Sequence, residues 1–312
     1  MSDYDTLISN HFGAYSNQTQ VVLYWLLQAT QDIAIGKETP EFIISLIGIF
    51  LNIFHLIILT RKSMRNTSIN VLMIGIATSD LYIMMCVVYN SPLSKIDSEC
   101  SPPWTYFRTV IEEIVFAMKD SFRRVTAWLA VLMAVIRFLI IKNPLNPKFD
   151  NLSLPSFSWK IILVLVVLSS SVSLADKARV QIVELPWTPP DHCNGFPANF
   201  TTIRYFAFIG LLENEEYSYS RILSVTEGII KIIPTISLPI LTFLLIREVR
   251  AKTSAHRRLS QNSDALKTDH ITKLVILMTF CFMITEGPIG IVFATESYLT
   301  SEEGFLKYPG FM

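Results

Sequence analysis

Six stretches of predominantly apolar residues, most of them about 20 residues long, limit what this 312-residue chain can fold into. A helix needs about 20 such residues to cross the ~30 Å hydrocarbon core of a bilayer. Charged residues make up 17% of the chain, below the roughly 25% of soluble domains. The sequence therefore predicts an all-α membrane protein. The stretches cover residues 41–60, 69–89, 104–141, 161–175, 222–246 and 271–294.

The distribution of charge and chemical motifs excludes two functional classes. The chain has 26 basic and 26 acidic residues, so it lacks the basic excess that neutralises nucleic-acid phosphates. Its five histidines are scattered, without the close spacing of metal ligands. The sequence has no phosphate-binding loop and no G-x-S-x-G nucleophile motif. We expect neither an enzyme nor a resident cofactor.

Basic residues in the short loops predict the orientation of the spans. Lysine and arginine collect on the cytoplasmic side of membrane proteins, and here they follow the first, third and fifth spans. The protein is therefore expected to lie in the plasma membrane with its amino terminus outside the cell. This topology divides the chain into an extracellular segment (1–40), a membrane bundle (41–294) and a short extracellular tail (295–312).

The predicted topology sorts the four cysteines. Cys100 and Cys193 fall in outer loops, whereas Cys86 and Cys281 fall within spans. Disulfides form in oxidising compartments, so a Cys100–Cys193 bridge is predicted. The alternative is a pair of unpaired extracellular thiols.

The same topology predicts sites of covalent modification. Asn17 and Asn199 lie in outward-facing N-x-S/T sequons and are expected to be glycosylated. Ser260 follows Arg257-Arg-Leu on a cytoplasmic loop, where phosphorylation would add about −1.5 to −2 charges beside two arginines.

Asp80 is a charged residue within the second span, where charge is costly and usually marks function or pairing. Asn52 lies at a similar depth on the first span. Two interpretations are open, and they are compatible: a buried polar clamp between helices, or an acid that binds a cation and senses the conformational state.

The third span carries charge on one face. At 100° per residue, a set of positions falls within about 40° of arc. These positions are Glu112, Lys119, Arg123, Ala130 and Arg137.

Two interpretations of the charges around Asp120 and Arg124 are also open. These residues are four apart, with the acid before the base, which favours an ion pair within one helix. Asp120, Arg123 and Arg124 would then satisfy one another. The alternative is a polar cavity that faces a ligand and includes the charges of later spans, namely Glu227, Lys231 and Glu286. Such a mixed cavity suits a zwitterionic or peptide ligand.

Several ordered motifs between residues 40 and 295 resemble those of nematode serpentine receptors of class w, within the rhodopsin-like superfamily of G-protein-coupled receptors. The motifs are Gly48-x-x-x-Asn52, Ala77-x-x-Asp80, Phe122-Arg-Arg124, Met133-Ala-Val-Ile-Arg137, Lys231-Ile-Ile-Pro234, Leu238-Pro239 and Glu286-Gly-Pro288-x-Gly290.

The resemblance implies a rhodopsin-like helical bundle that acts as a chemosensory or neuropeptide-type receptor. It implies that ligand binds between the outer halves of the helices. The charged residues of the mixed cavity are then the expected contacts of a peptide or small polar ligand, namely Glu112, Lys119, Asp120, Arg123, Glu227, Lys231 and Glu286. Arg137 would contact a heterotrimeric G protein. Asp80 and Asn52 would form a polar core that holds a sodium ion, and Pro288 would bend the sixth span.

The chain also departs from the superfamily pattern. Ile136 stands where the superfamily has an acidic residue before the arginine that corresponds to Arg137. Glu286 stands where the superfamily usually has an aromatic residue. The tail after residue 294 contains too many charges for a seventh span, so we expect six of the seven helices of the superfamily. We also expect that this chain does not signal by itself. The alternatives are a six-span channel or transporter, or a receptor remnant that does not signal.

Overall fold

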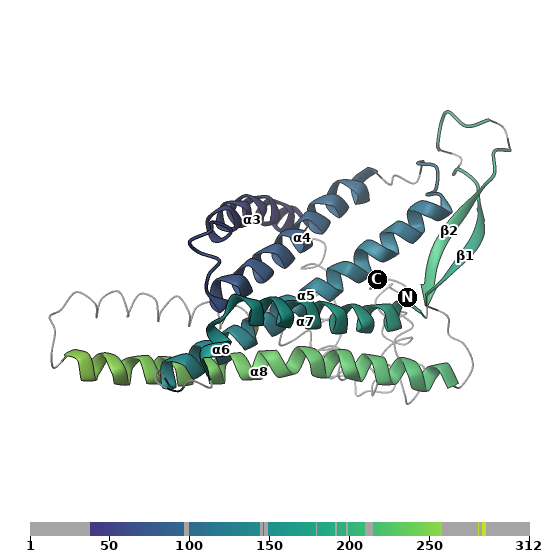
Figure 1. Cartoon of the computed structure of the whole chain (residues 1–312). Helices are drawn as coiled ribbons and strands as arrows, with labels where there is room; N and C mark the ends of the chain where they lie inside the picture. The colour runs from purple at the N-terminus through teal and green to yellow at the C-terminus, as the bar shows by residue number, and fades with distance from the viewer. Residues whose placement is uncertain are drawn as a thin grey trace, which may run out of the picture.

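A computed structural model describes residues 38–96, 100–143, 146, 149–178, 180–190, 192–197, 199–209, 215–257, 280 and 283–284. These residues form a bundle of long helices with a β-hairpin at one end (Figure 1). The described helices and strands are α3 (Glu38–Leu59), α4 (Ser68–Ile96), α5 (Tyr106–Lys142), α6 (Asp150–Ser153), α7 (Pro155–Lys177), β1 (Val180–Trp187), β2 (Thr202–Ile209) and α8 (Glu215–Arg257).

Five of the described helices, α3, α4, α5, α7 and α8, are long and apolar enough to cross a membrane. They correspond to the first five predicted spans, with ends that differ by at most two residues where a span extends beyond its helix. The all-α membrane architecture is thus confirmed for the bundle. Most of the sixth predicted span, residues 271–294, lies outside the described residues.

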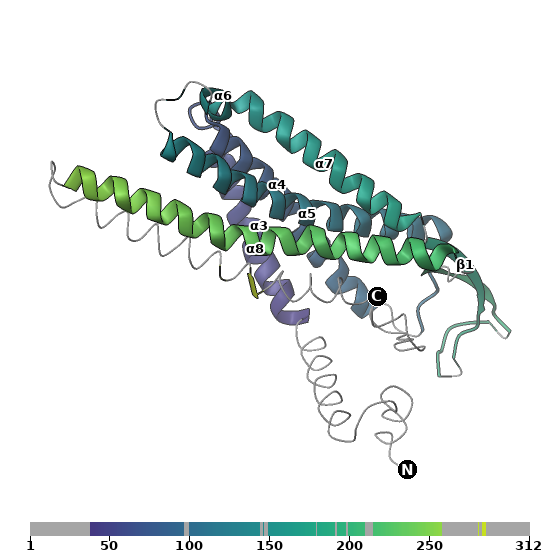
Figure 2. The same cartoon turned by 90° about the horizontal axis from the view of Figure 1, so that it is seen from below.

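Helix α5 is the central element of the bundle, since it contacts α4, α7 and α8. Figure 2 shows α5 crossing between α4, α7 and α8. Its 37 residues extend about 55 Å, more than the ~30 Å of hydrocarbon, so its polar ends project from the apolar layer. Its buried side chains Val125, Leu129 and Ile136 pack with Leu72 of α4 in the main core cluster.

Gly75 of α4 lies where three helices pack closely together. A Cβ atom at this position would lie 3.0 Å from the Cδ1 atoms of Leu129 on α5 and Ile162 on α7. Small residues allow membrane helices to pack closely, because lipid provides no hydrophobic drive for helix association. Away from this contact, the hydroxyls of Ser68 and Ser158, 2.5 Å apart, join α4 to α7.

The β-hairpin was not predicted from the sequence. Strands β1 and β2 pair antiparallel, from Val180 opposite Ile209 to Trp187 opposite Thr202. β2 contacts α5, and the rings of Tyr106 and Tyr205 lie 5.6 Å apart, edge to face. The hairpin therefore rests on the beginning of α5.

A disulfide fastens the hairpin loop to the segment before α5. Cys193, between the strands, bonds to Cys100, with the two Cα atoms 5.3 Å apart. The disulfide predicted from the sequence is thus confirmed. Cys86 is free and buried, as expected of a span cysteine.

We predict that removing this disulfide lowers the stability of the hairpin end of the bundle. The bridge joins residues separated by 93 positions, and loss of a native disulfide typically costs about 2–5 kcal/mol, in part by loop-closure entropy. Thermal unfolding of purified Cys100→Ser, Cys193→Ser and the double variant should give three similarly lowered Tm values. Cys86→Ala, which removes the buried thiol, is the matched control. Unchanged Tm values in all three bridge variants would contradict the prediction.

Candidate functional site

Helix α5 positions the charged residues singled out in the sequence on two of its faces. Glu112 faces α4, where it accepts a hydrogen bond from Tyr89. Arg124 points between α7 and α8, where it contacts Ser169, Ser173 and Glu227. These two polar groups are described in turn.

Arg124 forms a buried junction of three helices. Its Nη1 atom lies 2.7 Å and 2.9 Å from the two carboxylate oxygens of Glu227 on α8. Its Nη2 atom donates to the Ser169 carbonyl at 3.1 Å and to the Ser173 hydroxyl, both on α7. The guanidinium thus links α5, α7 and α8 by charge-assisted hydrogen bonds, the stronger kind.

Lys231 adds a second cation to this junction. Its Nζ atom lies 3.2 Å from Glu227, one helical turn earlier on α8. The Arg124 and Glu227 side chains are 5% and 15% exposed, and that of Lys231 is 12% exposed. Two cations therefore share one carboxylate in a largely buried site. The Nε atom of Arg124 is buried without a hydrogen-bond partner.

The structure pairs Arg124 with a different carboxylate from the one that the sequence favours. Spacing favours Asp120, one turn earlier on α5, whereas the structure places Glu227 of α8 against Arg124. Asp120, whose side chain is exposed, still interacts with the charges of Arg124 and Lys231, but the ion pair within hydrogen-bond distance of Arg124 is the one with Glu227. Glu227 and Lys231, both predicted site residues, are brought to Arg124.

Glu112 is buried against α4. The Tyr89 hydroxyl donates to its carboxylate at 2.8 Å, and the residue is 5% exposed. A carboxylate at this depth needs a hydrogen-bond donor, and tyrosine provides one from the neighbouring helix. Tyr89 was not identified from the sequence.

Asp80 and Asn52 have different partners in the structure. Asp80 accepts a hydrogen bond from Thr126 of α5 at 3.2 Å. The Asn52 side-chain amide donates to the Gly48 carbonyl and to the Met84 sulfur. Among the described residues, Asp80 is thus hydrogen-bonded to α5 rather than to Asn52.

The other predicted residues of α5 lie along the same helix. Lys119, Arg123 and Arg137 are partly buried, whereas Asp120 is exposed. Arg137 lies about 20 Å beyond Arg124 along the axis, toward the end of α5 that is remote from the hairpin (Figure 1). The helix therefore connects the hairpin end of the bundle to the opposite end.

Several predicted residues fall outside the described part of the chain. These are Glu286, Pro288, Ser260 and Asn17. Asn199 is described: it is exposed and adopts a φ of 61°, a backbone conformation that asparagine tolerates better than most residues. Its glycosylation stays a prediction.

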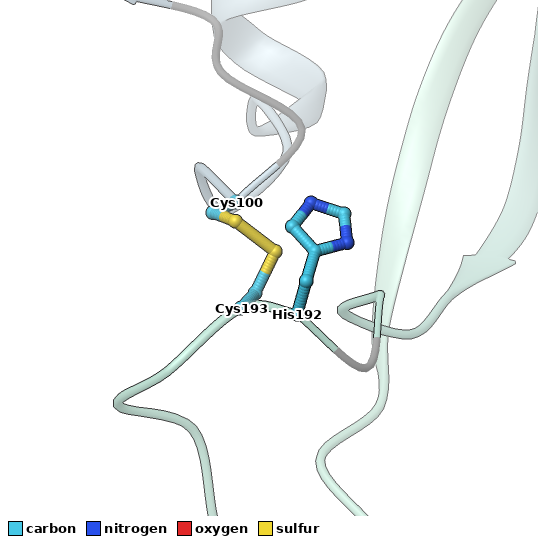
Figure 3. Close-up of side chains that lie close together, drawn as sticks. All are labelled: Cys100, His192 and Cys193. Carbon is cyan, nitrogen blue, oxygen red and sulfur yellow. A yellow bond between two sulfur atoms is a disulfide. The ribbon is translucent and has the colours of Figure 1, made fainter.

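Cys100, His192 and Cys193 form the group of potential metal ligands found among the described residues. Their ligand atoms lie within 4.8 Å of one another, and Figure 3 shows the imidazole beside the sulfur–sulfur bond. Metal binding requires thiolates, and these two sulfurs are committed to the disulfide. The group is therefore a structural bridge with a neighbouring histidine.

Ser169, through its backbone carbonyl, and Ser173, through its hydroxyl, are contacts of Arg124 that the sequence analysis missed. They belong to a serine-rich part of the fourth span that the sequence presents only as a weakly apolar segment. The Ser173 hydroxyl was the available signal, because a polar group within an apolar helix indicates a polar partner on an adjacent helix. The Ser169 contact left no signal in the sequence, since a residue of any type has a backbone carbonyl.

Comparison with known proteins identifies one family. The model of the family described as serpentine type 7TM GPCR chemoreceptor Srw matches residues 39–309, which is most of the chain. No curated protein matches. The match confirms the resemblance drawn from the sequence motifs.

We predict that Glu227→Ala destabilises the bundle strongly. The substitution leaves Arg124 and Lys231 buried without their shared carboxylate, and breaking a buried pair costs about 3–5 kcal/mol. Thermal unfolding of the purified protein should show a large loss of Tm. The double variant Arg124→Met with Glu227→Met should recover much of that loss, because it buries no unpaired charge at position 124.

Glu41→Ala is the matched control for this prediction. It removes a carboxylate that is exposed at the start of α3, and substitutions of exposed residues usually change stability by no more than about 0.5 kcal/mol. Equal Tm changes in Glu227→Ala and Glu41→Ala would refute a special role for the buried junction.

Proposed function

Because the chain belongs to the serpentine type 7TM GPCR chemoreceptor family Srw, we propose that it transmits the binding of an extracellular ligand to a heterotrimeric G protein at the plasma membrane. The family is one of receptors, not of enzymes, and the chain is a multi-pass membrane protein. The proposal adds the ligand class, the coupling partner and an extracellular amino terminus.

The buried junction of Arg124, Glu227 and Lys231 is the observation that supports the ligand class. It brings cationic and anionic side chains together in one largely buried place. A site of this kind favours a ligand that carries charges of both signs, because a ligand carboxylate would pair with Arg124 or Lys231. A ligand ammonium would in turn pair with Glu227. We therefore favour a peptide or a small zwitterionic molecule.

The remaining proposed ligand contacts extend this site along α5 and onto the sixth span. Glu112, held by Tyr89, lies nearer the hairpin than Arg124. Ligand binding at such a site would exchange ion pairs, because a charged group of the ligand would replace a protein side chain as the partner of another. The other proposed contacts are Lys119, Asp120, Arg123 and Glu286.

Arg137 is the proposed contact with the G protein. It lies toward the end of α5 opposite the hairpin, where the predicted topology places the cytoplasm. Pro288 is proposed to bend the sixth span.

A sodium ion beside Asp80 is a further part of the proposal. The Asp80 carboxylate and the Thr126 hydroxyl are oxygen donors of the kind that hard cations prefer. Asn52, hydrogen-bonded to Gly48 and Met84, is not joined to Asp80 in the described residues. The sodium site therefore rests on Asp80 and Thr126.

We predict that Arg137→Gln abolishes G-protein activation without removing the receptor from the cell surface. The substitution keeps much of the side-chain length and removes the positive charge proposed to bind the G protein. Cells expressing the full chain should be screened with pooled synthetic peptides and zwitterionic amines, with G-protein dissociation as the readout. Agonists found with the unaltered chain should lose activity in Arg137→Gln.

Lys142→Gln, at the exposed end of the same helix, is the matched control and should retain activity. An epitope tag after Met312, tested in intact cells, reports the topology in parallel. Absence of any response to the pools from a surface-expressed chain would favour the alternative of a receptor that does not signal alone. Full activity of Arg137→Gln would reject the proposed contact.

A further inference from the structure

A groove with a volume of about 380 Å³ lies between α5 and α7, beside β1. Its α5 wall is a helical stripe that runs from Val110 to Ser121, and its α7 wall runs from Ser170 to Lys177. Val180 and Ile182 of β1 close the end toward the hairpin. The volume lies within the range of about 300–1,000 Å³ typical of small-molecule sites.

The groove is on the lipid-facing surface of the described bundle. Ile114 on α5 and Leu174 on α7, which both line it, are 53% and 72% exposed. Both helices are long and apolar enough to span a membrane, so we expect such side chains to lie against lipid rather than water. The groove is therefore open to an occupant that is dissolved in the bilayer.

The polarity of the groove changes along its length. Its rim holds the ion pair between the Lys177 Nζ atom and a Glu113 carboxylate oxygen, 2.8 Å apart. Its inner end holds the Ser121 and Ser170 hydroxyls, which are 3.2 Å apart and satisfy each other. The walls between them carry apolar residues such as Ile114 and Leu174. An occupant that matches this pattern has a charged head and an apolar tail.

The apolar walls alone would not select an occupant. Lipid tails are as apolar as leucine, so moving a tail from the bilayer into an apolar groove gains little. Specific binding must come from the charged rim. Lys177 has three N–H donors and Glu113 has two acceptor oxygens, so each retains hydrogen-bonding capacity beyond the pair.

We propose that this groove binds a phosphatidylethanolamine molecule. Its phosphate would accept from Lys177, its primary ammonium would donate to Glu113, and one acyl chain would follow the apolar walls. Charge complementarity supports this occupant, because the rim presents one cation and one anion to a headgroup that carries one of each. The inference is independent of the ligand and the G protein proposed above.

The groove adjoins the buried junction. Ser173 lines the groove and also accepts a hydrogen bond from Arg124. A bound lipid would thus pack against the α7 residue that helps to hold Arg124. Occupancy should stabilise the contact between α5 and α7, because a ligand that binds the folded state raises stability.

The test uses the full chain in nanodiscs of phosphatidylcholine. A small fraction of phosphatidylethanolamine with a diazirine in its acyl chain is added, crosslinked by light and mapped by mass spectrometry. We expect crosslinks to concentrate at 110–121 and 170–182. Equal labelling of the exposed apolar surface of α3, such as Ile44 and Phe50, would overturn the proposal.

The headgroup is tested with two other diazirine lipids. Phosphatidylglycerol retains the phosphate and lacks the amine, and diacylglycerol lacks both. Phosphatidylethanolamine should label the groove most, phosphatidylglycerol less, and diacylglycerol no more than the α3 surface. Equal labelling by diacylglycerol would show a groove that takes any tail and would overturn the assigned headgroup contacts.

Variants locate the contacts. Lys177→Gln and Glu113→Gln should each lower phosphatidylethanolamine labelling by about tenfold, equivalent to about 1.4 kcal/mol. Lys160→Gln, at the other end of α7, is the control for lost charge. Labelling of both rim variants at the unaltered level would overturn the proposal.

Ala117→Phe fills the groove and should reduce labelling by all three lipids to that of the α3 surface. Leu168→Phe, on the opposite side of α7 and 59% exposed, is the control for an added ring. Gel filtration checks that each variant folds. Should Ala117→Phe fail to fold, the lipid comparison and the charge variants decide the result by themselves.

Discussion

The ion pair between Arg124 and Glu227, in which Nη1 contacts both carboxylate oxygens, is the interaction on which the arrangement of α5, α7 and α8 depends. Helices in a bilayer are not driven together by the hydrophobic effect, so packing and interhelical hydrogen bonds determine how they associate. Arg124 has its guanidinium at the point where three helices meet, and its planar group fixes the orientation of each. Lys231 and the serine oxygens of α7 complete that polar centre.

The two polar groups of α5 divide the bundle into two parts. On one side, Glu112 and Thr126 bond to Tyr89 and Asp80 of α4. On the other side, Arg124 bonds to α7 and α8. The single helix α5 carries both groups and so connects the contacts with α4 to the contacts with α7 and α8.

The sequence was sufficient to predict features that depend on local patterns. Spans follow from the length of apolar stretches, the disulfide follows from topology and redox compartment, and the family follows from ordered motifs. Pairings between distant residues could not be predicted: spacing favoured Asp120 for Arg124, and only the packing of α8 brings Glu227 there. The hairpin was missed because Val180–Trp187 and Thr202–Ile209 lie in a long loop whose pairing register depends on the loop's own fold.

The absence of a side chain at Gly75 affects how the molecule can move. With Leu129 and Ile162 within 3.0 Å of where a Cβ would stand, α4, α5 and α7 interlock by shape, and sliding one past another would produce steric clashes. Helix α8 is joined to this block differently, through ionic contacts, and contains Pro234 and Pro239, each of which removes a backbone hydrogen bond. Three of the helices thus interlock by shape at Gly75, whereas α8 joins them with a backbone whose hydrogen-bond ladder two prolines interrupt.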